Sequence, residues 1–431
     1  MGAALAPLAR ASSALAQEKW WESFPGFERS GPVRSSMDDD RRPEVLNDLR
    51  PNRLPLRSQE MVEALEDAIQ RYQQIVSNGG WPSIPGTRPI RPEDNDERVG
   101  LLYRRLAMSG DWRTRPTQSL FGVDYSDGLD SAVRRYQENN GLRVTGRVDR
   151  GTLLALNVPA QARLAQLRIN QQRLRDLAAN RSDERYVLVN AAGFQLEAVE
   201  RHEVERRHRV IVGKPERQTP TVRATIRALN FFPYWRVPES VATLDLIPRL
   251  AKEPEYLQQE GIRVLTGSYN GPEIDATNID WRHADAKLRF RQDPGPKNAL
   301  GLVRIDMPNE HGVYMHDTPM KPLFNQRSRA FSAGCVRVQE VFALVEWLAK
   351  YETGWDQPGR AQDVIATGQA LDMTLTRPVP VYFTYVTAWA EQDGRIIFRP
   401  DIYGRDGVRD LVASNERDPD DGPAPRWTLA P

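Results

Sequence analysis

Cys335 is the only cysteine in the 431-residue chain, and its setting could give it a chemical role. It ends the segment Ser332-Ala333-Gly334-Cys335, and fifteen residues separate His316 from Ser332. A thiolate is the nucleophilic form of cysteine. Because a free thiol has a pKa of about 8.5, it needs a base or a positive charge nearby. His316 could take the thiol proton, so the pattern predicts acyl transfer with Cys335 as nucleophile and His316 as base.

The turn before Cys335 has residues that suit an acyl-transfer site. Gly334 lets the backbone pass close to a substrate carbonyl, and the N–H groups of Gly334 and Cys335 could bind the developing oxyanion. Ser332 is expected either to cap this turn or to contact His316, and the sequence leaves both open. Ala333 completes the active-site loop.

The other histidines are expected to stay outside the chemistry. His311 and His316 could share a metal ion, but on a strand their spacing of five puts them on opposite faces. A single cysteine also excludes a cysteine-rich zinc site, so we expect no metal. His202, His208 and His283 stand among charged residues and are expected at the surface.

Composition limits the function classes. The chain has 59 Lys and Arg against 58 Asp and Glu, so a net charge of +1 gives no field that would steer it to nucleic acid or an anionic membrane. No apolar run approaches the roughly 18 residues that span a bilayer. A chain of 431 residues is expected to form two or three domains.

The first residues are small and apolar. Residues 1–16 contain no acid and end in Ala14-Leu15-Ala16, which is similar to the cleavage site of a secretory signal. A short apolar core leaves two interpretations, a signal-peptide remnant or a tail, and the cleavage pattern favours the signal. We therefore expect an exported protein.

Periodicity predicts an α+β multidomain chain. Apolar residues recur at helical spacing in three regions, and they switch to strand spacing after residue 185. A mainly β catalytic domain is expected over 183–400, with a helical lid insertion at about 238–292. The remaining predicted parts are an arm and helical scaffold (17–93), a small all-α domain (94–158), a connecting helix (159–182) and a C-terminal tail (401–431).

The predicted all-α domain resembles a known module. The stretch AVRRYQENNGLRVTGRVDRGTLLALN contains an aromatic-Gln pair, a Gly-Leu pair, a second Gly and then Thr-Leu. This order is similar to the small helical peptidoglycan-binding domain that accompanies many wall enzymes. A plain helical spacer with the same core residues is the alternative.

The segment around Cys335 resembles the active-site motif of the L,D-transpeptidases. In that family a His precedes, by about fifteen residues, a Ser/Thr-x-Gly-Cys-hydrophobic element, and His316, Ser332, Gly334 and Cys335 fall in register. Ala333 stands where many members have His. The long subfamily with a large lid has small residues at this position and is therefore the better match. Further segments that resemble the family are VIVGKPERQTPT, DPGPKNALGLVRI, ALNFFPYWRVPESV, YVTAW and DIYGRD.

The resemblance implies a reaction and its partners. Cys335 would attack the carbonyl after the L-centre of diaminopimelate in a tetrapeptide stem, and D-Ala would leave, protonated by His316. The amine of a second stem would then take the acyl group, giving a 3→3 cross-link. The family implies no cofactor, a periplasmic location, acylation by carbapenems, a role in cell-wall biogenesis and cell shape, and other wall-synthesis enzymes as partners.

Other functions stay open at this point. The acyl group could pass to water, as in an L,D-carboxypeptidase or hydrolase, or to a protein, as in a protein-to-peptidoglycan ligase. A peptidoglycan-binding scaffold without catalysis is the alternative from another class, although the pair of Cys335 and His316 argues against it.

Two neighbours of the predicted pair are candidates for substrate binding. Arg337 is either a surface salt-bridge partner, worth about 0–1 kcal/mol, or a bidentate ligand of a stem-peptide carboxylate. Its place beside Cys335 favours the second role. Tyr314 alternates with His316 on a predicted strand and is expected to line the pocket or to pack in the core.

Overall fold

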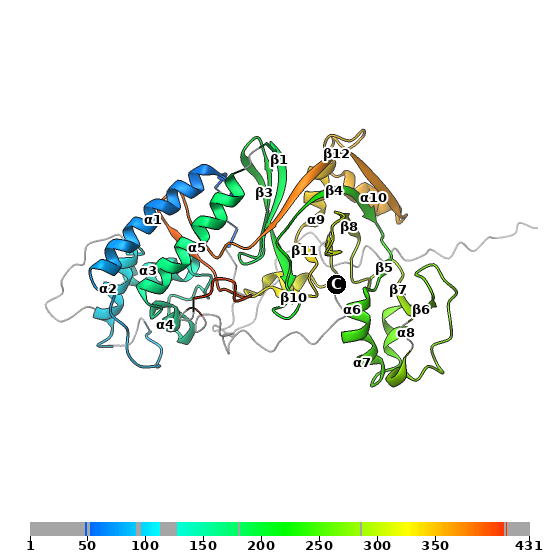
Figure 1. Cartoon of the computed structure of the whole chain (residues 1–431), viewed down its shortest axis with the longest axis horizontal. Helices are drawn as coiled ribbons and strands as arrows, with labels where there is room; N and C mark the ends of the chain where they lie inside the picture. Colours follow the sequence, from blue (N-terminus) through cyan, green and yellow to red (C-terminus); the bar gives the residue numbers. More distant parts are fainter. Residues whose placement is uncertain are drawn as a thin grey trace, which may run out of the picture.

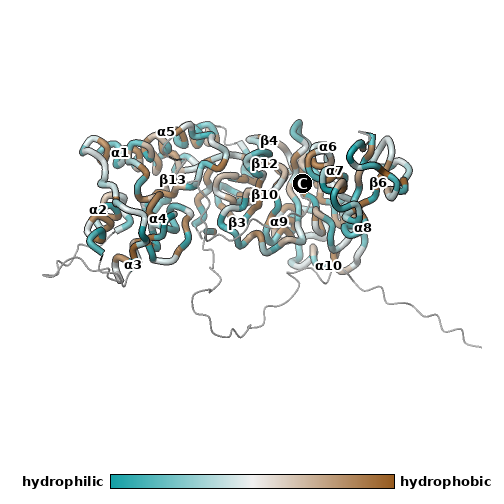
Figure 2. The backbone as a smooth tube through the Cα atoms, turned by 90° about the horizontal axis from the view of Figure 1, so that it is seen from below, coloured by the Kyte–Doolittle hydropathy of each residue, from teal (hydrophilic) through white to brown (hydrophobic). Residues whose placement is uncertain are grey.

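A computed structural model of the chain describes residues 48–49, 52–91, 96–112, 127–179, 182–284, 287–408 and 411. The predicted signal remnant over 1–16, most of the arm that follows it and the end of the predicted tail therefore lie outside the described residues. Figure 1 shows the described parts in a row: helices at one end, a large sheet in the middle and the lid at the other end. Figure 2 shows the same order from below.

The helical end combines a scaffold and a small domain. Helices α1 (Gln59–Ser77) and α5 (Ala160–Ala178) lie side by side, and both use buried leucines at the contact. The backbone N–H of Met61 donates to Ser58 Oγ at 3.1 Å, which caps α1 as its sequence predicts. The small domain consists of α2 (Val99–Ser109), α3 (Asp127–Asn139) and α4 (Arg150–Leu156).

The aromatic-Gln pair of the small domain has a physical role. Tyr136 lies in the apolar core between the helices. The buried side chain of Gln137 accepts the N–H groups of Thr145 and Gly146 at 2.9 and 3.0 Å, and it donates to the Arg147 carbonyl at 2.7 Å. One glutamine therefore holds the loop that leads to α4.

The central sheet closes on itself. Among the described residues, nine strands follow the order β10-β3-β11-β9-β8-β4-β12-β1-β2, and β3 also pairs with β2. The strands are β1 (Arg185–Asn190), β2 (Gln195–Glu200), β3 (Glu203–Gly213), β4 (Val222–Phe231), β8 (Val303–Asp306), β9 (Met315–His316), β10 (Ala330–Ser332), β11 (Val336–Val338) and β12 (Leu371–Thr384). Helices α9 (Val341–Ala349) and α10 (Arg360–Thr367) pack their apolar residues into its core. The predicted α+β fold with a mainly β catalytic part is confirmed.

The lid is more than the predicted helical insertion. Its helical turns are α6 (Glu239–Val241), η2 (Ala242–Leu246), α7 (Ile247–Leu250), α8 (Tyr256–Glu260) and η3 (Trp281–His283). It also contains an antiparallel sheet in the order β5-β7-β6, formed by Trp235–Arg236, Leu288–Gln292 and Ile262–Thr266. Trp235 and Phe290 are buried in a core of the lid's own.

After β12 the chain returns to the helical end. A hairpin of β13 (Ala388–Ala390) and β14 (Ile396–Phe398) packs on α1 and α5. Arg399 Nη1 donates to the Asn139 carbonyl of the small domain at 3.1 Å. The hairpin therefore connects the catalytic sheet with both helical parts.

One surface prediction is wrong. His208 lies on β3 and is buried, and its Nδ1 is 2.9 Å from the Gln339 carbonyl. Its neighbours Arg207 and Arg209 point to the other side of the strand, because successive side chains alternate. Separately, no helix in the described ranges is long and apolar enough to cross a membrane.

Candidate active site

Strand register places His316 between two arginines. On β9, His316 pairs with Arg304 of β8 and with Arg337 of β11. Paired residues of neighbouring strands point to the same face of a sheet. The imidazole is therefore flanked by a guanidinium on each side.

Cys335 joins the same face from the end of β11. The Val336 N–H donates to the Tyr314 carbonyl at 3.0 Å, which sets Cys335 beside Tyr314 one step before the paired strands begin. Residues two apart in a strand share a face, so Tyr314, His316, Cys335 and Arg337 project to one side. Tyr314 stacks edge-on against His316, with ring centroids 5.7 Å apart.

The tautomer of His316 is fixed by the backbone. Its Nδ1 lies 2.5 Å from the Asp317 carbonyl, which can only accept, so Nδ1 carries the hydrogen. The buried Nε2 has no hydrogen-bond partner among the described residues, Cys335 Sγ included. The imidazole thus presents an unused lone pair on the face that it shares with the thiol.

Burial keeps both groups neutral at rest. It raises the pKa of the Cys335 thiol to about 11, against the opposing effects of hydrogen bonds with Tyr314 and the charge of Arg337. The pKa of His316 is lowered well below its usual value, first by burial and then by the charge of Arg337. A thiol next to an unprotonated base can pass on its proton when a carbonyl arrives.

Asp317 anchors the loop that follows His316. Its carboxylate accepts the Leu302 N–H at 3.0 Å and forms an ion pair with Lys321. The side chain is fully buried. A Cβ at Gly301, where φ is +62°, would lie 2.4 Å from Asp317 Oδ2. Asp317 therefore contributes its carbonyl to the imidazole and its carboxylate to the loop, and only glycine at position 301 leaves it room.

Ser332 caps the turn before Cys335. Its Oγ donates to the Cys335 carbonyl at 2.6 Å and accepts the Gly334 N–H at 3.1 Å. Gly334 has a φ of +125°, a conformation that L-residues with a side chain rarely adopt. The Gly334 N–H is therefore already used within the turn, whereas the Cys335 N–H has no partner in the described part of the chain.

A second layer of hydrogen bonds fixes this peptide unit. Thr219 Oγ1 donates to the Gly334 carbonyl at 2.9 Å and accepts the Gly213 N–H at 2.9 Å. Tyr403 Oη donates to the Gly213 carbonyl at 2.7 Å and accepts the Thr219 N–H at 3.2 Å. In the sequence, only the segments QTPT and DIYGRD pointed to Thr219 and Tyr403, and neither residue had a predicted role.

Arg337 lines a cavity of about 240 Å³ under the lid. Its side chain is 3% exposed, and among the described residues it makes no ion pair and its Nε has no hydrogen-bond partner. Burial lowers its pKa to about 10. The other lining residues are Trp235, Tyr256, Glu260, Ile262, Gln292, Pro296, Lys297, Ala299, Thr318, Pro319 and Met320. The prediction that Arg337 forms a surface salt bridge is therefore wrong.

The other candidates lie away from this face. His311 is exposed, and the described residues contain no group of three His, Cys, Asp or Glu that could hold a metal ion.

The lid connects to the sheet through an ion pair of Arg217, in the β3–β4 turn, with Asp245 of η2. A buried thiol and a neutral imidazole on one face, beside a lidded cavity, define a candidate acyl-transfer site.

Comparison with known families identifies the two main parts. Residues 184–381 match the family described as "L,D-transpeptidase catalytic domain", and residues 95–156 match the "Putative peptidoglycan binding domain". The resemblances found in the sequence are thus confirmed. The chain therefore contains a region similar to an L,D-transpeptidase catalytic domain and, before it, a region similar to a peptidoglycan-binding domain.

One curated relative and two solved structures are similar to parts of this chain. A protein of Haemophilus influenzae named "Putative L,D-transpeptidase" is 34% identical over 251 residues, which cover 58% of this chain and half of the length of that relative. An L,D-transpeptidase structure from Xylanimonas cellulosilytica is 16% identical, with a TM-score of 0.22, over 70% of this chain and 98% of its own. One from Stackebrandtia nassauensis is 13% identical, with a TM-score of 0.26, over 70% and 96%.

Proposed function

We propose that this protein forms 3→3 cross-links between peptidoglycan stem peptides through a thioester on Cys335. The observation that carries the proposal is the thiol on the same strand face as an imidazole whose Nδ1 is tied to a carbonyl and whose Nε2 is unused. A nucleophile with a base oriented by a third group is the recurring arrangement of covalent acyl transfer.

The first half-reaction makes the thioester. Cys335 Sγ attacks the carbonyl that follows the L-centre of diaminopimelate, and the thiol proton moves to His316 Nε2. The Cys335 N–H donates to the oxyanion. The Gly334 N–H, bound by Ser332, holds the turn instead. The C–N bond then breaks, and the amine of D-Ala leaves with the proton from His316.

The second half-reaction restores the thiol. The side-chain amine of a second stem attacks the thioester carbonyl, His316 takes the amine proton, and the C–S bond breaks. The sulfur receives the proton back from the imidazolium. No metal or cofactor takes part in this scheme.

Arg337 supplies a binding site for a substrate carboxylate. A buried guanidinium without a counterion is costly, and its free Nε–H beside a cavity of about 240 Å³ offers a place for an anion. We assign this site to a carboxylate of the stem peptide. Tyr314 and Ala333 both contact the core of the lid.

The test is the product. Purified protein incubated with stem tetrapeptides should give a 3→3 dimer and free D-Ala by mass spectrometry, and Cys335→Ala should give neither while keeping its affinity for wall material. A tripeptide without a dimer would favour the carboxypeptidase or hydrolase. An adduct with a protein would favour the protein ligase. No product, together with no carbapenem adduct on Cys335, would favour the scaffold.

The place of action follows from the substrate. We propose that the protein works in the periplasm, where peptidoglycan is assembled, and that its peptidoglycan-binding domain keeps it on the wall beside other wall-synthesis enzymes. Fractionation of cells that express the protein would test the location, and recovery in the cytoplasmic fraction would contradict it.

A further inference from the structure

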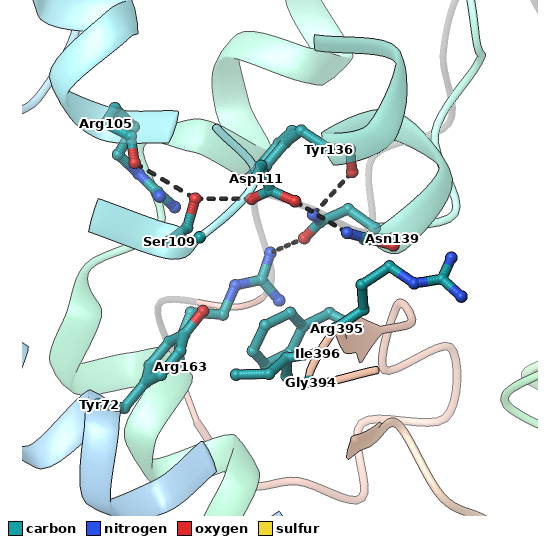
Figure 3. A pocket seen from close by; sticks show the side chains of 13 residues that line it. Tyr72, Arg105, Ser109, Asp111, Tyr136, Asn139, Arg163, Gly394, Arg395 and Ile396 are labelled. Atoms are coloured by element: carbon teal, nitrogen blue, oxygen red, sulfur yellow. Dashed lines mark hydrogen bonds between the residues drawn. The ribbon is translucent and has the colours of Figure 1, made fainter. Parts of the chain in front are cut away.

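A second pocket lies between the peptidoglycan-binding domain and the rest of the chain. Its walls come from α1, α2, α3, α5 and the turn between β13 and β14, and none of its residues lines the cavity beside Arg337 (Figure 3). Its lining includes Tyr72, Arg105, Asp111, Tyr136, Asn140 and Arg163. Its enclosed volume is about 20 Å³, enough for one water or the end of one small polar group.

The pocket holds two buried cations and one acid. Arg105 and Arg163 are 2% and 4% exposed, and neither forms an ion pair with any described residue. The carboxylate of Asp111 is bound elsewhere, because it accepts Ser109 Oγ at 2.6 Å and Asn139 Nδ2 at 2.8 Å (Figure 3). Burial raises the pKa of Asp111, which further weakens its compensation of the two arginines.

Both guanidiniums are held in place by aromatic rings. Arg105 stacks over Trp81 at 3.6 Å, and its Nε donates to the Leu156 carbonyl at 2.8 Å. Arg163 lies over Phe398 at 4.4 Å and donates to Asn140 Oδ1 at 3.2 Å. A guanidinium stacked by its face presents its N–H groups along its edge. The donors are therefore oriented before any ligand arrives.

Two polar atoms in the pocket lack partners. Arg105 Nη1 and the Tyr136 hydroxyl are buried without a hydrogen-bond partner among the described residues, and both residues are 2% exposed. An unpaired buried donor costs about 1–3 kcal/mol. Both atoms can donate, and the Tyr136 oxygen can also accept. An acceptor-rich, negatively charged group would pair with both donors and offset the two guanidinium charges.

We propose that this pocket binds a carboxylate of a peptidoglycan stem peptide, distinct from the stem that reacts at Cys335. The choice of peptidoglycan rests on the proposed function, whereas the choice of a carboxylate rests on the donors alone. One side of the pocket belongs to the peptidoglycan-binding domain and the other to the scaffold and hairpin. A bound carboxylate would therefore connect the wall to both parts at once.

Tyr136→Phe is the sharpest variant. The hydroxyl makes no hydrogen bond of good geometry with a described residue and interacts only with the Arg163 guanidinium, so its removal should change stability little. A hydrogen bond to a charged group is strong enough that its loss should weaken carboxylate binding about tenfold or more. Tyr103→Phe, a hydroxyl removal on α2 outside the pocket lining, is the matched control. Arg105→Gln removes the charge and should abolish binding.

Ligand binding is measured by hydrogen exchange of the segments around the pocket, in the full chain that carries Cys335→Ala. Hydrogen exchange of segments 105–111 and 394–398 is followed against the stem tetrapeptide, the same peptide with amidated carboxyls, and sodium acetate. We expect saturable protection by the acid peptide, none by the amide, and weak protection by acetate. Arg337→Gln should leave this protection intact, which separates the pocket from the cleft.

Each other outcome overturns the inference. No protection by the acid peptide means that the pocket holds water only. Equal protection by acid and amide means that no carboxylate is recognised, and equal affinity in Tyr136→Phe means that the free donors play no part. If acetate binds as tightly as the peptide, the site takes any carboxylate and the stem assignment fails. Because Cys335→Ala cannot form a thioester, the result is independent of whether the wild-type enzyme cross-links.

Discussion

Replacing Thr219 by valine should damage catalysis without touching either member of the reacting pair. Thr219 is 1% exposed, and its hydroxyl joins the Gly213 N–H to the Gly334 carbonyl. The carbonyl of Gly334 and the N–H of Cys335 belong to one peptide plane and point in opposite directions. Holding the carbonyl on Thr219 therefore aims the Cys335 N–H at the developing oxyanion.

The structure sets the size of the effect. Thr219→Val is nearly isosteric and leaves one buried donor and one buried acceptor unpaired, at about 1–3 kcal/mol each. Loss of a whole oxyanion donor lowers kcat by about 10²–10³. Because the variant rotates the donor instead of removing it, we expect kcat to fall about tenfold to a hundredfold, with KM little changed.

The assay distinguishes a changed orientation of the Cys335 N–H from a changed position of the Cys335 thiol. D-Ala release from the tetrapeptide gives kcat and KM, and alkylation of the thiol by iodoacetamide, which needs no oxyanion site, reports whether Cys335 itself has moved. Thr219→Ser keeps both hydrogen bonds and should keep most of the activity. A kcat within twofold of wild type in Thr219→Val, or an equal fall in the alkylation rate, would refute the reasoning.

Three further changes test other parts of the structure. Burial lowers the pKa of His208 to about 4, so below pH 6.5 the unfolded chain takes up a proton at this residue and the free energy of unfolding falls until about pH 4. His208→Gln should therefore reduce the difference in unfolding free energy between pH 7 and pH 4.5, measured in urea, by about 2 kcal/mol, and an unchanged difference would contradict this. Arg337→Gln should raise KM for the acid tetrapeptide about tenfold but not for its C-terminal amide, and it should move the acid limb of the pH–rate profile to higher pH, because the charge of Arg337 lowers the pKa of His316. Gly301→Ala places a Cβ 2.4 Å from Asp317 Oδ2 and should cost about 1–3 kcal/mol in thermal unfolding, whereas an unchanged transition would show that the loop yields freely.

Local patterns in the sequence predicted much of the fold. Ser58 and Asp149 cap their helices as expected, because a cap depends on residues three positions apart. The lid sheet was missed because its strands are short and pair across an irregular stretch between residues 266 and 288. Such pairing depends on contacts far apart in the sequence, which periodicity does not report.

The candidate site was predictable in its residues but less so in its connections. The motif around Cys335 identified the nucleophile, the base and the turn as candidates. The row of Arg304, His316 and Arg337 depends on the pairing of three strands that are separate in the sequence. Thr219 and Tyr403 meet only because the end of the chain returns to β3.

The two guanidiniums beside His316 have a consequence for how the enzyme meets its surroundings. Burial, the charge of Arg337 and, more weakly, that of Arg304, which is shared with Asp306, make this imidazole a poor place for a proton to stay. Any proton that it takes from a thiol is therefore passed on quickly to the departing amine, and the same effects protect the base from outside acid. An enzyme built in this way would continue to work in a mildly acidified medium that would silence an ordinary histidine.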